Sequence, residues 1–228
     1  KMPKEKNVPK EKNTKSRDKE QDNYLQKFTI AVFGGSGVGK TSLINHLVGI
    51  KFNPEHVPTI EDFHVKHIAF KNKTCELQII DTSGTYEFPA MRRVDMEKAD
   101  ALVLVYSMDR PESFKKLERY MEELSQSRNN SAKDCIKPVV VVSNKSDLPN
   151  LKEPMFMDKR GLSISVGRHL EVKYGCHWFD ASAKLGNNVQ DAFLKNLDCL
   201  VRSCSKERPS RPVRRISSMI QRRIKSPR

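Results

Sequence analysis

Gly34-Gly35-Ser36-Gly37-Val38-Gly39-Lys40-Thr41 is the stretch that decides the fold of this chain, because it fits the phosphate-loop pattern G-x-x-x-x-G-K-[ST]. An apolar run over residues 28–33 predicts a buried strand before the loop, and residues 41–48 favour a helix after it. In such a loop the backbone N–H groups turn toward phosphate oxygens, while Lys40 supplies a positive charge and Thr41 a hydroxyl ligand for Mg²⁺. An ordinary glycine-rich turn is the alternative, which the flanking strand and helix disfavour.

A second motif, Asn144-Lys145-Ser146-Asp147, follows another buried run over residues 139–142. Ligands of open α/β sheets bind at the C-terminal ends of the strands, so we expect this motif to face the phosphate loop. The carboxylate of Asp147 can accept hydrogen bonds from the guanine ring N–H and the guanine amino group, a donor pair that adenine lacks. Taken alone the motif also fits a polar turn, but together with a phosphate loop it predicts guanine recognition.

The positive charge of the chain lies mainly at its two ends. The 228 residues carry a formal net charge of +14. Residues 1–27 hold nine Lys or Arg against five Asp or Glu, and residues 205–228 hold nine against one, which leaves +2 for residues 28–204. We therefore expect a disordered lysine-rich extension over residues 1–27, one globular domain over residues 28–204 and a basic tail over residues 205–228.

The cysteines and the hydropathy disfavour several other classes of protein. The five cysteines form no C-x-x-C pair and no cluster with histidine, a scatter typical of reduced thiols in the cytosol rather than of disulfides or zinc sites. No apolar run approaches the length of a membrane span and no signal peptide is visible, which predicts a cytoplasmic protein.

Strand and helix patterns alternate through the middle of the chain. Apolar runs at residues 63–70 and 74–80, separated by a short polar turn, predict a β-hairpin. Further strands are predicted over residues 101–106, 139–142 and 178–181, and helices over residues 111–127, 162–174 and 189–201. This alternation predicts an α/β fold with a mostly parallel six-stranded sheet, one antiparallel edge strand and helices on both faces.

The motifs together resemble a Ras-superfamily small GTPase over residues 28–204. Pro58-Thr59-Ile60-Glu61-Asp62 is similar to the first switch and effector loop, Asp81-Thr82-Ser83-Gly84 to the second-switch motif D-x-x-G, and Ala181-Ser182-Ala183-Lys184 to the S-A-K motif that supports the base. The resemblance implies a P-loop NTPase that binds GTP and GDP with Mg²⁺ and switches between two states.

Within the Ras branch, the chain looks most like the atypical Dexras/Rhes members, with Di-Ras next. The segments that carry this resemblance are Thr59–His64, Asp81–Gly84 and Phe88–Arg93. The resemblance implies a monomer whose effector proteins bind the Pro58–Asp62 loop, and which is served by an exchange factor and a GTPase-activating protein.

The resemblance implies metal and catalytic roles for residues of both switches. Thr41 and Thr59 would ligate Mg²⁺, and Asp81 would hold a water bound to that ion. Gly84 would offer its N–H to the γ phosphate, which a residue without a side chain can approach closely. The residues expected to act in catalysis are Lys40, Thr59, Gly84 and Thr85.

The resemblance also implies how the nucleotide is held. Asn144 would bond the base and brace the phosphate loop, the stem of Lys145 would cover the base plane, and the N–H of Ala183 would reach the guanine oxygen. Phe52 would pack edge-on against guanine, with plain packing as the alternative. The other expected nucleotide-binding residues are Gly35, Ser36, Gly37, Val38, Gly39, Ser42 and Asp147, with Ser182 and Lys184, for which a solvated turn is the alternative.

Three positions depart from the usual family pattern. Thr85 stands where most members have the glutamine that orients the attacking water, and Ser36 where they have a glycine against the γ phosphate. His56 replaces the tyrosine that closes over the nucleotide. Thr85 and Ser36 predict slow intrinsic hydrolysis, or alternatively an activating protein that supplies the missing groups. A constitutively GTP-loaded, effector-binding module with vestigial hydrolysis is the second function that these residues favour.

The basic tail has a pattern that suits an anionic membrane face. Val213, Ile216, Ile220 and Ile224 recur at spacings of three and four, with arginines between them. The tail predicts peripheral attachment at the inner face of the plasma membrane without a C-a-a-X box, and a solvated tail is the alternative. Nucleic-acid binding is not expected, because no aromatic platform accompanies the charge.

Overall fold

The computed structural model describes residues 26–55, 58–71, 73–85, 89–130, 137–149 and 155–206, without the side chains of residues 127–130 and 204–206. The predicted extension up to residue 25 and the basic tail from residue 207 lie outside the described residues, as do His56 and Phe88. No helix in the described ranges combines the length and the apolar character that crossing a bilayer requires.

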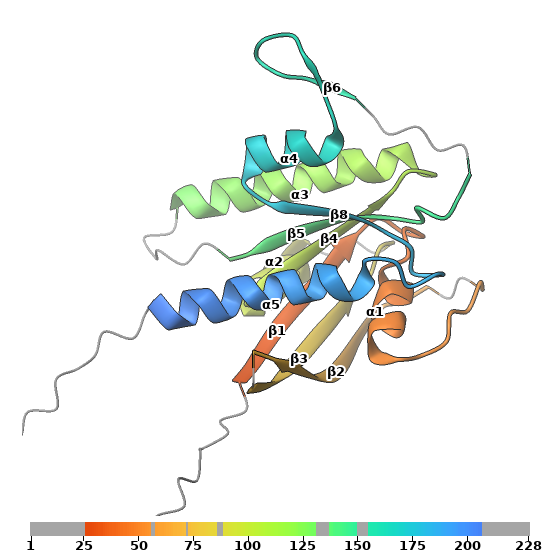
Figure 1. Ribbon diagram of the computed structural model, residues 1–228, viewed down its shortest axis with the longest axis vertical. Coiled ribbons are helices and arrows are strands. Elements are labelled where there is room, and N and C mark those ends of the chain that lie inside the picture. The colour runs from red at the N-terminus through yellow and green to blue at the C-terminus, as the bar shows by residue number, and fades with distance from the viewer. Residues whose placement is uncertain are drawn as a thin grey trace, which may run out of the picture.

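Six of the described strands form one sheet in the order β2-β3-β1-β4-β5-β8 (Figure 1). All neighbouring pairs are parallel except β2 and β3, so the hairpin places one antiparallel strand, β2, at the edge. The strands are β1 Gln26–Gly34, β2 Glu61–Phe70, β3 Lys73–Thr82, β4 Ala101–Ser107, β5 Val139–Asn144 and β8 His177–Ala181. The predicted fold class is thereby confirmed.

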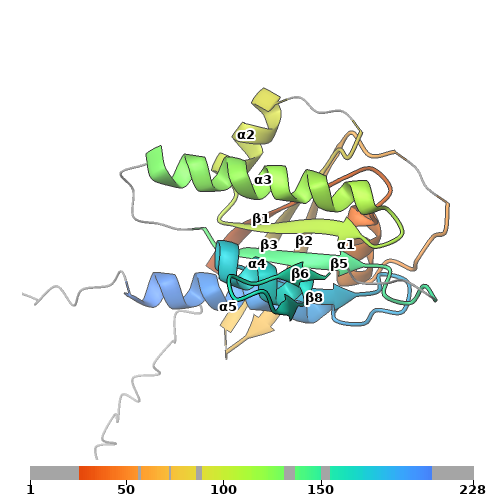
Figure 2. The same ribbon diagram turned by 90° about the horizontal axis from the view of Figure 1, so that it is seen from above.

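Helices cover both faces of the sheet. Figure 2 shows α2 and α3 on one side of the sheet and α5 on the other. The described helices are α1 Lys40–Val48, α2 Pro89–Lys98, α3 Pro111–Asn130, α4 Val166–Tyr174 and α5 Val189–Lys206. Connections between parallel strands therefore cross over through helices, as the alternating sequence pattern predicts.

Two hydrophobic clusters, one on each face of the sheet, form the core. One cluster joins α1 and α5 to the sheet through residues such as Ile44 and Phe193, and it contains the free thiol of Cys75. The other joins α2, α3 and α4 through residues such as Leu117 and Leu170. Strands β4 and β5 are buried along their whole length, because side chains on both of their faces pack under helices. The resulting rigid sheet holds the loops at its C-terminal edge in place.

The structure corrects the predicted start of one helix and adds elements that the sequence pattern does not reveal. Helix α4 begins at Val166 rather than at Leu162, because the Ser165 side chain caps it by accepting a hydrogen bond from the Arg168 N–H. Before this cap, β6 Phe156–Met157 and β7 Ser163–Ile164 form a short antiparallel pair. Helix α2 was not predicted, since only Asp95 and Met96 of its residues are buried and its apolar pattern is weak.

Candidate functional site

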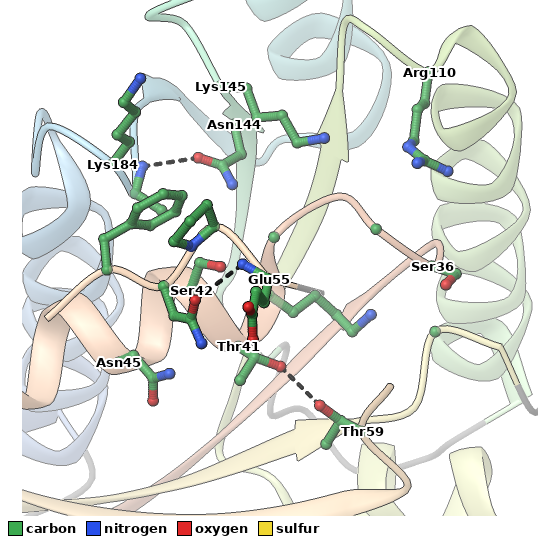
Figure 3. A pocket seen from close by; sticks show the side chains of 18 of the residues that line it. Ser36, Thr41, Ser42, Asn45, Glu55, Thr59, Arg110, Asn144, Lys145 and Lys184 are labelled. Atoms are coloured by element: carbon green, nitrogen blue, oxygen red, sulfur yellow. Dashed lines mark hydrogen bonds between the residues drawn. The ribbon is translucent and has the colours of Figure 1, made fainter. Parts of the chain in front are cut away.

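The predicted site residues come together in one cavity of about 550 Å³ at the C-terminal edge of the sheet (Figure 3). Such a volume suits a nucleotide-sized ligand. The predicted residues that line the cavity are Ser36, Gly37, Gly39, Lys40, Thr41, Ser42, Phe52, Thr59, Gly84, Thr85, Asn144, Lys145, Asp147, Ala183 and Lys184. Four others, Gly35, Val38, Asp81 and Ser182, are not among the lining residues, and each contacts one that is.

The phosphate loop runs from the end of β1 into the start of α1. Gly37 and Gly39 have φ angles of 71° and 93°, in the left-handed region that residues with side chains rarely adopt. A Cβ atom on Gly39 would stand 2.2 Å from the amide nitrogen of Asn144, so the loop can approach the base motif this closely only with glycine there.

Lys40 is buried beneath the phosphate loop, with 6% of its surface exposed. Its amino group donates hydrogen bonds of 3.1 Å to the carbonyls of Gly34 and Gly35. Burial lowers the pKa of Lys40 to about 8, although the nearby carboxylate of Asp81 opposes this shift. An anion in the cavity would compensate the cost of burying this charge, so the site favours a phosphate group.

Three oxygen-bearing side chains meet beside the phosphate loop. The Thr41 hydroxyl donates to Asp81 Oδ2 at 2.5 Å and lies 2.9 Å from the Thr59 hydroxyl (Figure 3). Asp81 is fully buried, burial raises its pKa, and among the described residues its Oδ1 atom has no hydrogen-bond partner. Two hydroxyls and an incompletely satisfied carboxylate are hard oxygen donors, so this set fits Mg²⁺.

A Mg²⁺ ion in this place would depend on few protein ligands. No group of three or more His, Cys, Asp or Glu side chains that could hold a metal occurs within the described ranges. Mg²⁺ commonly keeps several waters and takes one or two protein ligands together with substrate phosphates. The few oxygen ligands that the protein offers here therefore fit a Mg²⁺ ion whose remaining ligands are waters and the oxygens of a bound phosphate chain.

Asn144 joins the phosphate loop to the loop after β8. Its amide nitrogen donates to the Val38 carbonyl at 2.9 Å, and its amide oxygen accepts from the Ala183 N–H at 3.0 Å. The residue is 98% buried, with 2% of its surface exposed. The Ala183 N–H, expected to reach the guanine oxygen, therefore already has a partner in Asn144, and a guanine oxygen would share this donor.

Asp147 is oriented by a serine behind it. The buried Ser182 hydroxyl donates to Asp147 Oδ1 at 2.6 Å and accepts from the Leu185 N–H at 3.0 Å. Ser182 is fully buried, so the solvated-turn alternative does not describe its side chain, whereas Lys184 is exposed at the cavity rim. Among the described residues only Ser182 donates a side-chain hydrogen bond to Asp147, so its second carboxylate oxygen can accept hydrogen bonds from a base.

Lys145 and Phe52 shape the wall around the expected base position. Lys145 has a φ angle of 69°, and its amino group donates to Asp109 Oδ2 at 2.8 Å. Burial would raise the pKa of Asp109, but hydrogen bonds from Lys145 and Ser107 outweigh it and lower that pKa. Phe52 is 39% exposed and lines the cavity instead of packing into either core cluster. An aromatic ring so placed can pack against a planar ligand.

Thr85 and Ser36, two of the three departures from the usual family pattern, contact each other. The Thr85 hydroxyl donates to the Ser36 hydroxyl at 3.1 Å, which links the loop after β3 to the phosphate loop. Both side chains line the cavity. The Ser36 side chain therefore lies where a glutamine at position 85 would have to extend in order to contact an attacking water.

Sequence reasoning missed two basic residues near the start of α3. Arg110 lines the cavity, and a Cβ atom on Gly37 would stand 2.9 Å from its guanidinium carbon (Figure 3). Lys116 donates to the Gly84 carbonyl at 3.1 Å. A signal was available for Arg110, because the loop after β4 lies beside the loop after β1 at the C-terminal edge of a parallel sheet.

Comparisons with known proteins agree with this geometry. A model of the Ras family matches residues 29–202. The chain is 34% identical over 171 residues to the GTP-binding protein drn-1 of Caenorhabditis elegans, covering 75% of this chain and 74% of that protein. It is 34% identical over 170 residues to the GTP-binding protein Rhes of Homo sapiens, covering 73% and 62%. It is also 34% identical over 172 residues to the GTP-binding protein Di-Ras2 of Mus musculus, covering 75% and 80%.

Proposed function

Because the chain belongs to the Ras family of small GTPases, we propose that it is a signalling switch that binds GTP and GDP with Mg²⁺ and hydrolyses GTP slowly. The observation that carries the proposal is the meeting of the phosphate loop, both switch segments and the base motif in one cavity. The hydrogen bonds of Asn144 to Val38 and Ala183 support the proposal, since they fix the positions of the phosphate-binding and base-binding loops relative to each other.

The residues of the cavity suit a reaction in which water attacks the γ phosphate. A Mg²⁺ ion held by Thr41, Thr59 and, through a water, Asp81 would neutralise charge on the β and γ phosphate oxygens. The Lys40 ammonium stabilises the negative charge that develops toward the β–γ bridge. The N–H of Gly84 donates to a γ-phosphate oxygen. Catalysis thus rests on positioning and electrostatics, as is usual for phosphoryl transfer.

Slow hydrolysis is expected because Thr85, and not a glutamine, lies beside the expected position of the attacking water. Thr85 is too short to offer the paired donor and acceptor of a glutamine amide, and its hydroxyl is bonded to Ser36. A second candidate, a GTP-loaded module that binds effectors with vestigial hydrolysis, is favoured by this same contact. The two differ only in whether the chain turns over GTP at all.

A single-turnover assay with the purified full chain tests the proposal. The protein is loaded with GTP, free nucleotide is removed, Mg²⁺ is added and the ratio of GDP to GTP is followed. A measurable rate that disappears in Lys40→Met supports the switch. No conversion above the uncatalysed rate, with GTP still bound, supports the effector-binding module instead. Failure to bind either guanine nucleotide contradicts both.

Effector binding through the Pro58–Asp62 loop is part of the proposal. The adjoining strand β2 lies at the sheet edge and exposes Phe63 and Val65, next to the exposed Asp62, and Ile60 is exposed just before the strand. An open edge with apolar and acidic side chains suits a partner that adds a strand and brings basic residues. Charge reversal at Glu61 and Asp62 would then abolish GTP-dependent capture of an effector and preserve nucleotide affinity.

Membrane attachment through the basic tail remains a proposal that rests on sequence alone. Each basic residue near an anionic leaflet contributes about 1 kcal/mol, so several engaged arginines suffice for reversible binding. Sedimentation with phosphatidylserine vesicles, comparing the full chain with a chain ending at Ser205, tests it. Equal sedimentation of both chains would contradict the tail as the anchor.

A further inference from the structure

Lys116 connects the second switch to a helix that follows a different strand. Its amino group donates to the Gly84 carbonyl at 3.1 Å. Gly84 lies in the loop after β3, whereas Lys116 is a half-buried residue in the second turn of α3, which follows β4. The bond therefore links the glycine of the switch loop to a helix, and it restricts a backbone that has no side chain to limit it.

Gly84 lies close to the amino groups of both Lys40 and Lys116. A Cβ atom on Gly84 would stand 2.6 Å from the Lys40 amino nitrogen and 2.7 Å from both the Gly35 carbonyl oxygen and the Ser36 Cα atom. The switch glycine thus lies against the phosphate loop and accepts a hydrogen bond from Lys116. No larger residue fits there unless the phosphate loop moves.

The charges of Lys116 and Lys40 also repel each other, because the charge of Lys116 adds to the lowering of the Lys40 pKa. An anion bound near both amino groups would offset this repulsion. In the proposed function the terminal phosphate of the nucleotide is the group that Gly84 and Lys40 both face. A diphosphate lacks this group and its charge.

We propose that Lys116 is a positioning residue for the terminal phosphate, which makes the cavity prefer a nucleoside triphosphate over a diphosphate. It does so in two ways. It restricts the backbone of Gly84, so that less conformational freedom is lost when the switch loop closes on the γ phosphate. It also adds a positive charge near that phosphate. This inference rests on the proposed guanine-nucleotide function.

The test compares Lys116→Met with Lys115→Met in the full chain. Methionine keeps an unbranched stem but removes the amino group, and Lys115 is the exposed neighbour on the same helix. Dissociation constants are measured with Mg²⁺ for GDP and for a non-hydrolysable GTP analogue. A lost charge-assisted hydrogen bond predicts that the preference of Lys116→Met for the analogue over GDP falls about tenfold. We expect unchanged GDP affinity, an unchanged preference in Lys115→Met, and a preserved preference in Lys116→Arg.

Each other outcome has a definite meaning. An unchanged preference in Lys116→Met overturns the inference, and so does an equal loss of affinity for both nucleotides. The same loss in Lys115→Met would attribute the effect to net charge and overturn it as well. If Lys116→Met does not fold, Lys116→Gln is judged by the same ratio. A wild-type chain that binds neither nucleotide would instead refute the proposed function.

Discussion

Replacing Asn144 with alanine should weaken both the fold and the nucleotide site. The substitution removes two hydrogen bonds of a 98% buried side chain and leaves the Val38 carbonyl and the Ala183 N–H without this partner. Each buried polar group left unpaired costs about 1–3 kcal/mol, so the loss of both bonds should lower the free energy of unfolding by about 2–6 kcal/mol.

Asn196 offers a matched control for this experiment. It is a fully buried asparagine on α5, and its amide nitrogen donates to the Leu102 carbonyl at 3.0 Å, away from the cavity. Asn196→Ala breaks one such bond and should cost about 1–3 kcal/mol of stability. Urea unfolding and GDP titration are measured for both variants. We expect GDP affinity to fall about tenfold or more in Asn144→Ala and to stay unchanged in Asn196→Ala.

Two results would refute this reasoning about Asn144. If Asn144→Ala is no less stable than Asn196→Ala and binds GDP as wild type does, Asn144 does not hold the two loops together. If both variants lose GDP affinity in proportion to their lost stability, the effect on binding is a general consequence of a weakened fold. The role of Asn144 in holding the two loops together is supported only if Asn144→Ala loses more GDP affinity than Asn196→Ala does for the same loss of unfolding free energy.

Three further predictions concern other residues of the cavity. Since burial lowers the pKa of Lys40 to about 8, the free protein must take up a proton above that pH to pair with phosphate. GDP affinity should therefore fall by up to about tenfold per pH unit from pH 8 to pH 9, and a flat binding profile would contradict this. Asp147→Asn should shift preference from GDP toward XDP, because an amide presents a donor where xanthine has an oxygen; unchanged competition would remove Asp147 from the base site. Ser36→Gly with Thr85→Gln should raise single-turnover hydrolysis about tenfold or more, and equal rates would place the slow step elsewhere.

The central sheet and the family were predictable because their signals are local in sequence. The apolar run over residues 139–142 and its partner over residues 101–106 mark buried parallel strands, and both are confirmed as β5 and β4. The predicted resemblance to the Ras branch is confirmed by the family model and the relatives. The roles assigned to individual site residues stay predictions, although the structure brings these residues to one place.

The parts that sequence reasoning missed depend on contacts between distant segments. The bond from Thr85 to Ser36 spans 49 positions and the bond from Lys116 to Gly84 spans 32, so no local pattern reveals them. Helix α4 was placed too early because the apolar side chain of Leu162 fits the helical period. Its N–H instead donates to Asp158, which closes a turn before the helix.

The weak attachment of α2 has a consequence for motion. Only Asp95 and Met96 of this helix are buried, and burial raises the pKa of the Asp95 carboxyl, so that the burial itself opposes the charged form. An element with so little apolar contact can open at a free energy far below that of global unfolding. Polar contacts also hold this helix, from Arg92 to Glu123 and from Lys137 to the Met96 carbonyl. We expect α2, which follows the second switch, to open when these contacts break, while β1, β4 and β5 remain intact. Amide hydrogen exchange in α2 would then report the state of the switch independently of the stability of the domain.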